Sequence, residues 1–414
     1  MKKNRLHYSW IILVVGITVV AGALGLSRFS YGMLLPSLQE GLNLTHNQTG
    51  LIASVNMLGY TLAALAVGRL SHRYGPRMVI GISLLWAALT LAAVGLAGSV
   101  VTVLILRFFT GVGSAGANIA MMGLSSSWFA ENRRGSANGF LVGGSGLAIL
   151  LTGWLVPQVL NVFPEYGWRL NWLFLGILVL VFALLSLALI RNHPSEKGLL
   201  PLGANNSKEQ QKETEDRFYG TKEIMMFKGV PTIALIYFCF GASYIIYVTF
   251  FVNYLVTEKA VTQVLAGEIW SLVGFLSIGS AIIWGSLSDM IGRAYALMTV
   301  FFLQTISYVL LAGMMGITYI WISAIIFGLT AWSIPGIMAS YCGDLLGSKN
   351  ATGALGLITL FFSIGSVLAP SIAGYIRELS DSFAAAFYLA ALLALLGGVL
   401  SLYLGRRNSI RNHA

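Results

Sequence analysis

The protein has 414 residues and a net charge of +10, and 57% of its residues are hydrophobic while only 10% are charged. Soluble domains carry roughly 25% charged residues, so this composition excludes a soluble core, a disordered chain and a disulfide scaffold. The mean hydropathy of +0.80 predicts long apolar helices in a lipid bilayer.

Apolar stretches of about 20 residues, each long enough to cross a ~30 Å hydrocarbon layer as a helix, recur along the chain. The first follows Lys2, Lys3 and Arg5 as a signal peptide would, but it continues to Pro36 and eleven others follow, so we expect a retained helix. The predicted spans are 9–36, 46–68, 77–97, 99–127, 136–157, 169–190, 229–256, 264–287, 294–315, 317–343, 351–375 and 382–404.

One long polar segment of mixed charge, residues 191–228, divides the spans six and six and is typical of a solvated linker. The sequence therefore predicts an all-α membrane protein. We expect an amino-terminal six-helix bundle at 1–190, a cytoplasmic linker at 191–228 and a carboxyl-terminal six-helix bundle at 229–414.

Basic residues are distributed unevenly over the predicted loops and tails. With the amino terminus inside, 20 of them fall in cytoplasmic segments and three in external ones, while Arg28 and Arg107 lie within spans. This bias is the positive-inside signal of a multi-pass protein. It predicts a cell-membrane protein with both termini in the cytoplasm, and it explains the basic net charge without a nucleic-acid partner.

The two halves look like copies of one another. Segment 68–77 reads GRLSHRYGPR, and segment 285–293, 217 residues further on, reads GSLSDMIGR. The same shift carries Gly111 onto Gly328 and Gly139 onto Gly356. Repeats of six spans are typical of transporters whose substrate site lies near the middle of the membrane.

Both loop segments resemble the signature loop of the major facilitator superfamily, and RFFTGVG at 107–113 is similar to the motif of its fourth span. The resemblance covers the whole chain. It implies two six-helix bundles related by pseudo-two-fold symmetry. It further implies an inner-gate charge contact in the carboxyl-terminal half, where Asp289 stands, whereas His72 replaces the acid of the first loop. The residues that it marks for gating or coupling are Arg73, Arg107, Asp289 and Arg293.

Two further segments resemble one branch of that superfamily. GLSRFSYGMLLP at 25–36 is similar to the first helix of the bacterial YbfB/YjiJ-type transporters, and FGASYIIYVTF at 240–250 is similar to their seventh helix. The monocarboxylate and oxalate/formate branch is the next nearest in style. Neither segment implies a particular substrate.

Arg28 is the most informative single residue, because a guanidinium in hydrocarbon is costly and must face a polar interior. It is interpreted either as a structural arginine bonded to backbone carbonyls or as the residue that binds an anion, since its planar fork matches a carboxylate. No acidic residue lies deep in any predicted span, which favours the second interpretation. Tyr31 follows on the same helical face.

Neutral polar residues in other spans complete the predicted substrate site. Asn118 shares a face of the fourth span with Arg107 and Ser114, and its amide is suited equally to a substrate or to a neighbouring helix. Asn56 and Tyr60 are one turn apart in the second span. The predicted substrate-binding residues are Arg28, Tyr31, Asn56, Asn118, Tyr244 and Tyr247.

Enzymatic functions find no support in the sequence. All five histidines fall in predicted loops or tails, no phosphate-binding Gly-x-x-x-x-Gly-Lys segment is present, and no span carries paired deep carboxylates. These patterns argue against a metal site, ATP hydrolysis and acid–base catalysis. We expect no catalytic residue, no cofactor and no bound metal.

The sequence thus predicts a monomeric secondary transporter that moves a small organic anion, such as a monocarboxylate, by alternating access. Proton symport and anion exchange are both open as modes. Efflux of amphipathic compounds is an alternative, favoured by spans rich in methionine and aromatic residues. A transport-inactive membrane sensor is a second alternative from a different class.

Overall fold

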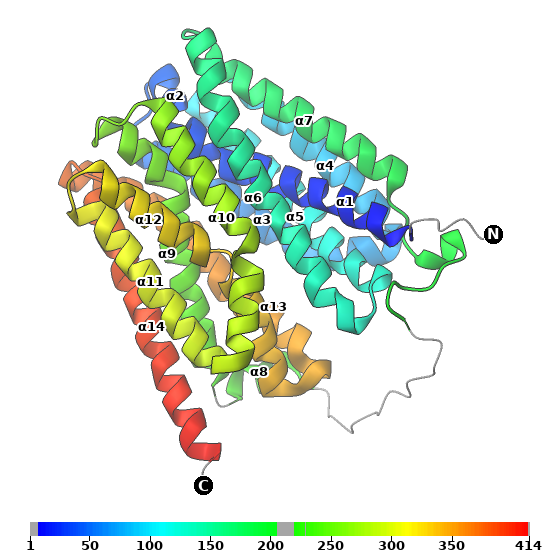
Figure 1. Ribbon diagram of the computed structural model, residues 1–414. Helices are drawn as coiled ribbons and strands as arrows, with labels where there is room; N and C mark the ends of the chain where they lie inside the picture. Colours follow the sequence, from blue (N-terminus) through cyan, green and yellow to red (C-terminus); the bar gives the residue numbers. More distant parts are fainter. Residues whose placement is uncertain (1–6, 205–218, 228, 413–414) are drawn as a thin grey trace. The chain divides into compact units, whose positions relative to one another are not determined.

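The computed structural model describes residues 7–204, 219–227 and 229–412, and these are almost entirely helical (Figure 1). Within them, the β-structure is limited to a bridge between Phe129 and Leu202. Twelve helices in this part of the chain are long and apolar enough to cross a membrane, which confirms the predicted fold class. Residues 205–218 of the predicted linker lie outside the described residues.

The first six spans follow the predicted order, with helices that extend several residues further at some ends. Segment 69–74, predicted as a loop, forms the last turns of a helix instead. The elements are α1 (Ser9–Val20), the π-helix η1 (Ala21–Phe29), α2 (Ser30–Leu42), α3 (His46–Tyr74), α4 (Pro76–Val94), α5 (Val100–Trp128), α6 (Glu131–Val162), α7 (Gly167–Leu189) and the short 3₁₀ helix η2 (Pro194–Lys197).

The last six spans include one that is interrupted. The tenth span breaks at residues 331–333, where Pro335 lacks the N–H that would bond four residues back. The next span continues the same assigned helix through a turn at Gly347, whose φ is +75°. The elements are α8 (Thr221–Met226), α9 (Val230–Thr257), α10 (Gln263–Ile291), α11 (Arg293–Gly313), α12 (Ile317–Thr330), α13 (Ile334–Ser380) and α14 (Ala384–Asn412).

Two equivalent glycines make the turns within the two repeated loop segments. Gly75 separates α3 from α4 with φ +81°, and Gly292 separates α10 from α11 with φ +90°. Side chains with a Cβ rarely adopt such angles, so glycine fits both positions. The two positions are 217 residues apart, so the backbone repeats the shift seen in the sequence.

The contacts divide the chain into two compact units that exchange the beginnings of two helices. Unit 1 comprises Met1–Leu44, Val55–Glu209 and Gln263–Gly274, and unit 2 comprises Thr45–Ser54, Gln210–Thr262 and Phe275–Ala414. The first turns of α3 therefore belong to unit 2, and those of α10 belong to unit 1.

Each exchanged segment packs closely through a glycine. In unit 2, a Cβ on Gly50 would collide with the carbonyl oxygen of Pro370, and Ser371 Oγ donates to Ser54 Oγ at 2.8 Å. In unit 1, a Cβ on Gly267 would collide with the carbonyl oxygen of Gly153. Small residues let helix backbones approach within a membrane, so both contacts depend on the missing side chain.

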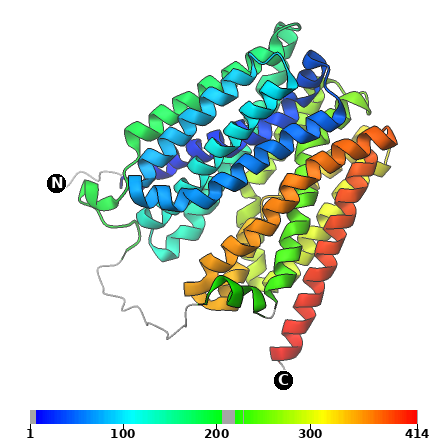
Figure 2. The same ribbon diagram turned by 180° about the vertical axis from the view of Figure 1, so that it is seen from behind.

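Within unit 1, α4 packs against α5 and α7, while η1 packs against α5 and α6. Within unit 2, α14 lies along α11 (Figure 1), and α9 packs against α13 and α14, which flank it in Figure 2. In the most apolar 18-residue stretch of α9, 89% of the residues are buried, whereas in the most apolar stretch of α7 the share is 33%. The first helix of the second half is thus enclosed by its neighbours.

Candidate functional site

The first span widens at the place where Arg28 lies. Residues Ala21–Phe29 form a π-helix, in which Ser27 Oγ also donates to the carbonyl of Gly22, five residues back, at 2.7 Å. A Cβ on Gly25 would collide with Ala148, so the wide segment lies tightly against α6. π-Helical turns inside α-helices often occur at functional sites. Arg28 sits in the last turn of this one.

Three elements of unit 1 form a polar group around Arg28, which is half-buried. Its guanidinium carbon lies 5.9 Å from the ring centroid of Tyr60 on α3 and 5.2 Å from that of Phe29. Asn118 on α5 donates from Nδ2 to the Tyr60 hydroxyl at 2.9 Å. The structure thus brings Arg28 and Asn118 together through Tyr60, a contact that spacing alone does not indicate.

Arg107 occupies a different environment, enclosed within unit 1 with 1% of its surface exposed. Its Nη1 donates to the carbonyl of Ser27 at 2.6 Å. Its guanidinium carbon lies 5.1 Å from the ring centroid of Tyr31 and 5.6 Å from that of Trp172. Cation–π contact with two aromatic rings and a backbone acceptor stabilises the buried charge. Nothing in the sequence pattern pointed to Trp172.

Two predicted substrate residues lie beside Arg107. Tyr31 and Asn56 are each 2% exposed. The Tyr31 ring faces the guanidinium of Arg107, and Asn56 Nδ2 donates to the backbone carbonyl of Arg107 at 2.7 Å. In this structure both side chains contact α5, and their role in substrate binding stays a prediction.

The predicted residues of the seventh span are buried in unit 2. The Tyr247 ring stacks on Phe327 at 3.9 Å between centroids, and its hydroxyl lies 3.0 Å from Ser323 Oγ. The Tyr244 ring stacks on Phe240 at 4.8 Å. These rings belong to aromatic groups of unit 2, and the polar group around Arg28 is the candidate site within unit 1.

The second loop segment holds two ion pairs of Arg293, and its role in gating stays a prediction. Arg293 contacts Asp289 at 2.5 Å and Asp344 at 3.1 Å, and its Nη1 donates to Ser288 Oγ at 2.6 Å. In the first segment, the guanidinium carbon of Arg73 lies 5.3 Å from the ring centroid of Tyr74. Both carboxylates that pair with Arg293, those of Asp289 and Asp344, belong to unit 2.

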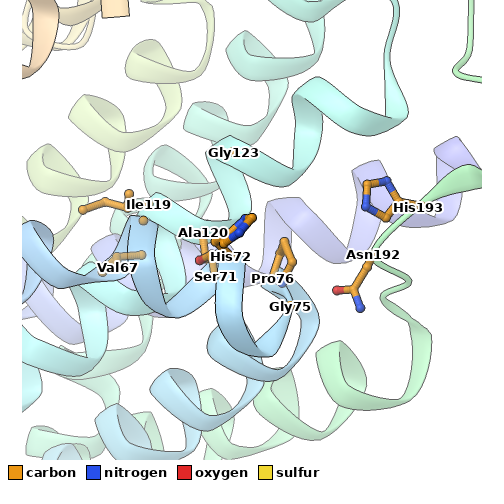
Figure 3. Close-up of a pocket in the computed structure, with 11 residues that line it drawn as sticks. Val67, Ser71, His72, Gly75, Pro76, Ile119, Ala120, Gly123, Asn192 and His193 are labelled. Atoms are coloured by element: carbon orange, nitrogen blue, oxygen red, sulfur yellow. The ribbon is translucent and has the colours of Figure 1, made fainter. Parts of the chain in front are cut away.

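The first loop segment borders a cavity of about 490 Å³. In Figure 3, Ser71 and His72 stand between Ile119 of α5 and Pro76 at the start of α4. The lining is completed by residues from α3, from the turn after it, from α5 and from the segment after α7: Val67, Gly68, Gly75, Ala120, Gly123, Asn192 and His193. His72 thus borders a cavity, whereas Asp289, the equivalent residue of the second loop segment, forms an ion pair.

Comparison with known proteins identifies the family. Residues 20–402 match the family described as "Uncharacterised MFS-type transporter YbfB". The chain belongs to this family of the major facilitator superfamily. This confirms the resemblance and makes the protein a multi-pass membrane protein of a transporter family, in agreement with the expected lack of an enzymatic role.

The individual relatives that match over most of the chain share about a quarter of its residues. The chain is 24% identical to the hexuronate transporter of Bacillus subtilis, over 92% of this chain and 91% of that protein. It is 24% identical to the probable sulfoacetate transporter SauU of Cupriavidus necator (92% and 90%) and 25% identical to the probable galactarate/D-glucarate transporter GudP of B. subtilis (92% and 88%).

Among solved structures, a bacterial homologue of the human lysosomal transporter Spinster has a similar fold. The TM-score is 0.74 at 13% identity, with 98% of each chain covered. At this identity the match supports the fold alone.

Proposed function

We propose that the protein is a secondary transporter that carries a small organic anion across the cell membrane, with Arg28 as the residue that binds the anion. The observation that carries the proposal is the half-buried guanidinium of Arg28 in a π-helical segment, next to the polar groups of Tyr60 and Asn118. A planar guanidinium binds a carboxylate through two parallel hydrogen bonds.

The contrast with Arg107 supports this assignment. Arg107 is enclosed by Ser27, Tyr31 and Trp172 and is explained by the structure of the bundle. Relatives named as transporters of hexuronate, sulfoacetate and glucarate all have anionic substrates. Both proton symport and anion exchange are compatible with such a site.

Uptake of radiolabelled anions into proteoliposomes tests the proposal, with a hexuronate, a tartrate and a monocarboxylate as probes. Uptake that exceeds that of empty liposomes and is lost in Arg28→Gln is the expected result. A wild-type protein that moves none of these anions but exports amphipathic cations would contradict it in favour of efflux. A folded protein that binds an anion without moving it would favour a sensor.

The proposed orientation places both termini and residues 191–228 in the cytoplasm, because of the uneven distribution of basic residues. A cysteine introduced at Ser195, which is exposed, is expected to resist an impermeant thiol reagent in intact cells and to react after lysis. Labelling of this cysteine in intact cells would contradict the proposed orientation and place residues 191–228 outside.

A further inference from the structure

One face of α5 carries a row of polar residues that includes Arg107, Ser114 and Asn118. Arg107, Ser114 and Asn118 are spaced by seven and four positions, which places them within about 40° of one another around the helix axis. This face is turned toward the first and second spans, since Arg107 donates to Ser27 and Asn118 donates to Tyr60. The face therefore runs past the candidate anion site.

Two acceptors on this face have no hydrogen-bond partner among the residues that the structure describes. They are Ser114 Oγ, in a side chain that is 1% exposed, and Asn118 Oδ1, in a residue that is half-buried. Ser114 and Asn118 are one turn apart, about 6 Å along the axis. Proteins rarely leave buried polar atoms unpaired, so these two oxygens point to a ligand that supplies donors.

Tyr60 connects these acceptors to the anion site. Its hydroxyl accepts the hydrogen bond from Asn118 Nδ2, so its own proton is left to donate. Its ring lies against the guanidinium of Arg28, at 5.9 Å. Donors suited to a carboxylate, from Arg28 and Tyr60, thus stand next to acceptors suited to hydroxyl groups, from Asn118 and Ser114.

We infer that the site selects organic anions that carry hydroxyl groups, and that Asn118 and Ser114 determine this specificity. The inference rests on the proposed function, in which Arg28 holds the carboxylate. A hydroxylated acid pairs its hydroxyl protons with Asn118 Oδ1 and Ser114 Oγ, whereas a plain carboxylate of equal charge leaves both oxygens unpaired. Sites built to pair with a substrate hydroxyl discriminate strongly against analogues that lack it.

The experiment compares acids that differ only in hydroxyl groups. Dissociation constants are measured on the purified protein for tartrate against succinate, for lactate against propionate and for glucarate against adipate. We expect the hydroxylated member of each pair to bind at least tenfold more tightly, since one buried hydrogen bond gained is worth roughly that factor. Arg28→Gln is expected to weaken binding of both members.

Variants assign the preference to the two residues. Ser114→Ala removes one acceptor with little change in volume, and Asn118→Leu removes the other together with the bond to Tyr60. Each is expected to lower the preference for the hydroxylated acid at least threefold. Asn171→Leu is the matched control, because Asn171 Oδ1 on α7 is also buried and lacks a partner within the described ranges, while its Nδ2 donates to Gly167 and Val156.

The outcomes separate the inference from the proposed function. Equal affinity for tartrate and succinate in the wild type overturns the hydroxyl preference and leaves an anion transporter in place. Full preference in both Ser114→Ala and Asn118→Leu, or an equal loss in Asn171→Leu, overturns the assignment to α5. Binding of none of the six acids overturns the proposed function and the inference together.

Discussion

The two halves of the chain share a repeat but carry different chemistry. The 217-residue shift that aligns the loop glycines places Ile245 opposite Arg28, Ala324 opposite Arg107 and Pro335 opposite Asn118. Arg28 and Asn118 therefore have apolar equivalents in the second half, where an aromatic cluster surrounds Tyr247. A duplicated scaffold can thus concentrate polar groups in one copy while the equivalent positions of the other copy are filled by packing.

The two repeated loop segments differ in the other direction, because the second copy carries the charge contact. Asp289 pairs with Arg293 in the second copy, whereas its equivalent His72 borders a cavity in the first. The glycine contacts, by contrast, recur in both copies, because Gly50 and Gly267 are equivalent and each lies against a backbone carbonyl. Charge placement diverged while the close helix contacts did not.

Arg107→Ala places in the first half the residue that Ala324 provides at the equivalent position of the second half. Of the substitutions considered, it is expected to lower stability the most. It removes the charge bound by Ser27, Tyr31 and Trp172 and leaves a buried void, at an expected cost of about 3–5 kcal/mol. Yield of monodisperse protein and melting temperature measure it. A melting temperature equal to that of the wild type would contradict the structural role of Arg107.

Arg28→Gln and Arg28→Lys test the other arginine. Removal of one partner of a desolvated charge pair costs about 2–5 kcal/mol, a loss of roughly thirtyfold or more in affinity. Lys retains the charge but loses the bidentate fork, so its affinity is expected to fall between those of Gln and wild type. Ligand-induced thermal stabilisation measures apparent affinity. Normal anion binding by folded variants would move the search for the site to Arg107 and Asn118.

Gly50→Leu tests whether the recurring glycine contacts are needed. A side chain there must displace α3 from Pro370, at roughly 1–3 kcal/mol. In a protein with Cys239 and Cys342 replaced by Ala, cysteines at Ser54 and Ser371 are expected to cross-link, because the two serine hydroxyls lie 2.8 Å apart. Gly50→Leu should lower the cross-linking yield, and Gly68→Leu, with open space around its Cβ position, should not.

Much of the fold and part of the site could be predicted from the sequence. Twelve spans and the placement of Arg28 inside a helix bundle follow from the cost of polar groups in hydrocarbon, which leaves a strong pattern in the chain. The π-helix at Ala21–Phe29 leaves no comparable pattern, because it depends on packing against α5 and α6. The same holds for Trp172 and for the bond between Tyr60 and Asn118, since interhelical contacts join residues distant in sequence.

The smallest expected effect concerns the two loop copies. Asp289→Asn removes the negative charge next to Arg293, while His72→Asn removes no fixed charge. The Asp289 side chain is 63% exposed, and exposed ion pairs contribute about 0–1 kcal/mol. Hydrogen exchange in segment 285–297 should therefore rise about two- to fivefold in Asp289→Asn, because local opening follows local stability. Segment 68–80 should change less in His72→Asn, and Asp289→Glu, which keeps the charge, should stay near wild type. An equal response of the two segments to their Asn variants would show that the charge asymmetry of the loops has no effect on the stability of these helix ends.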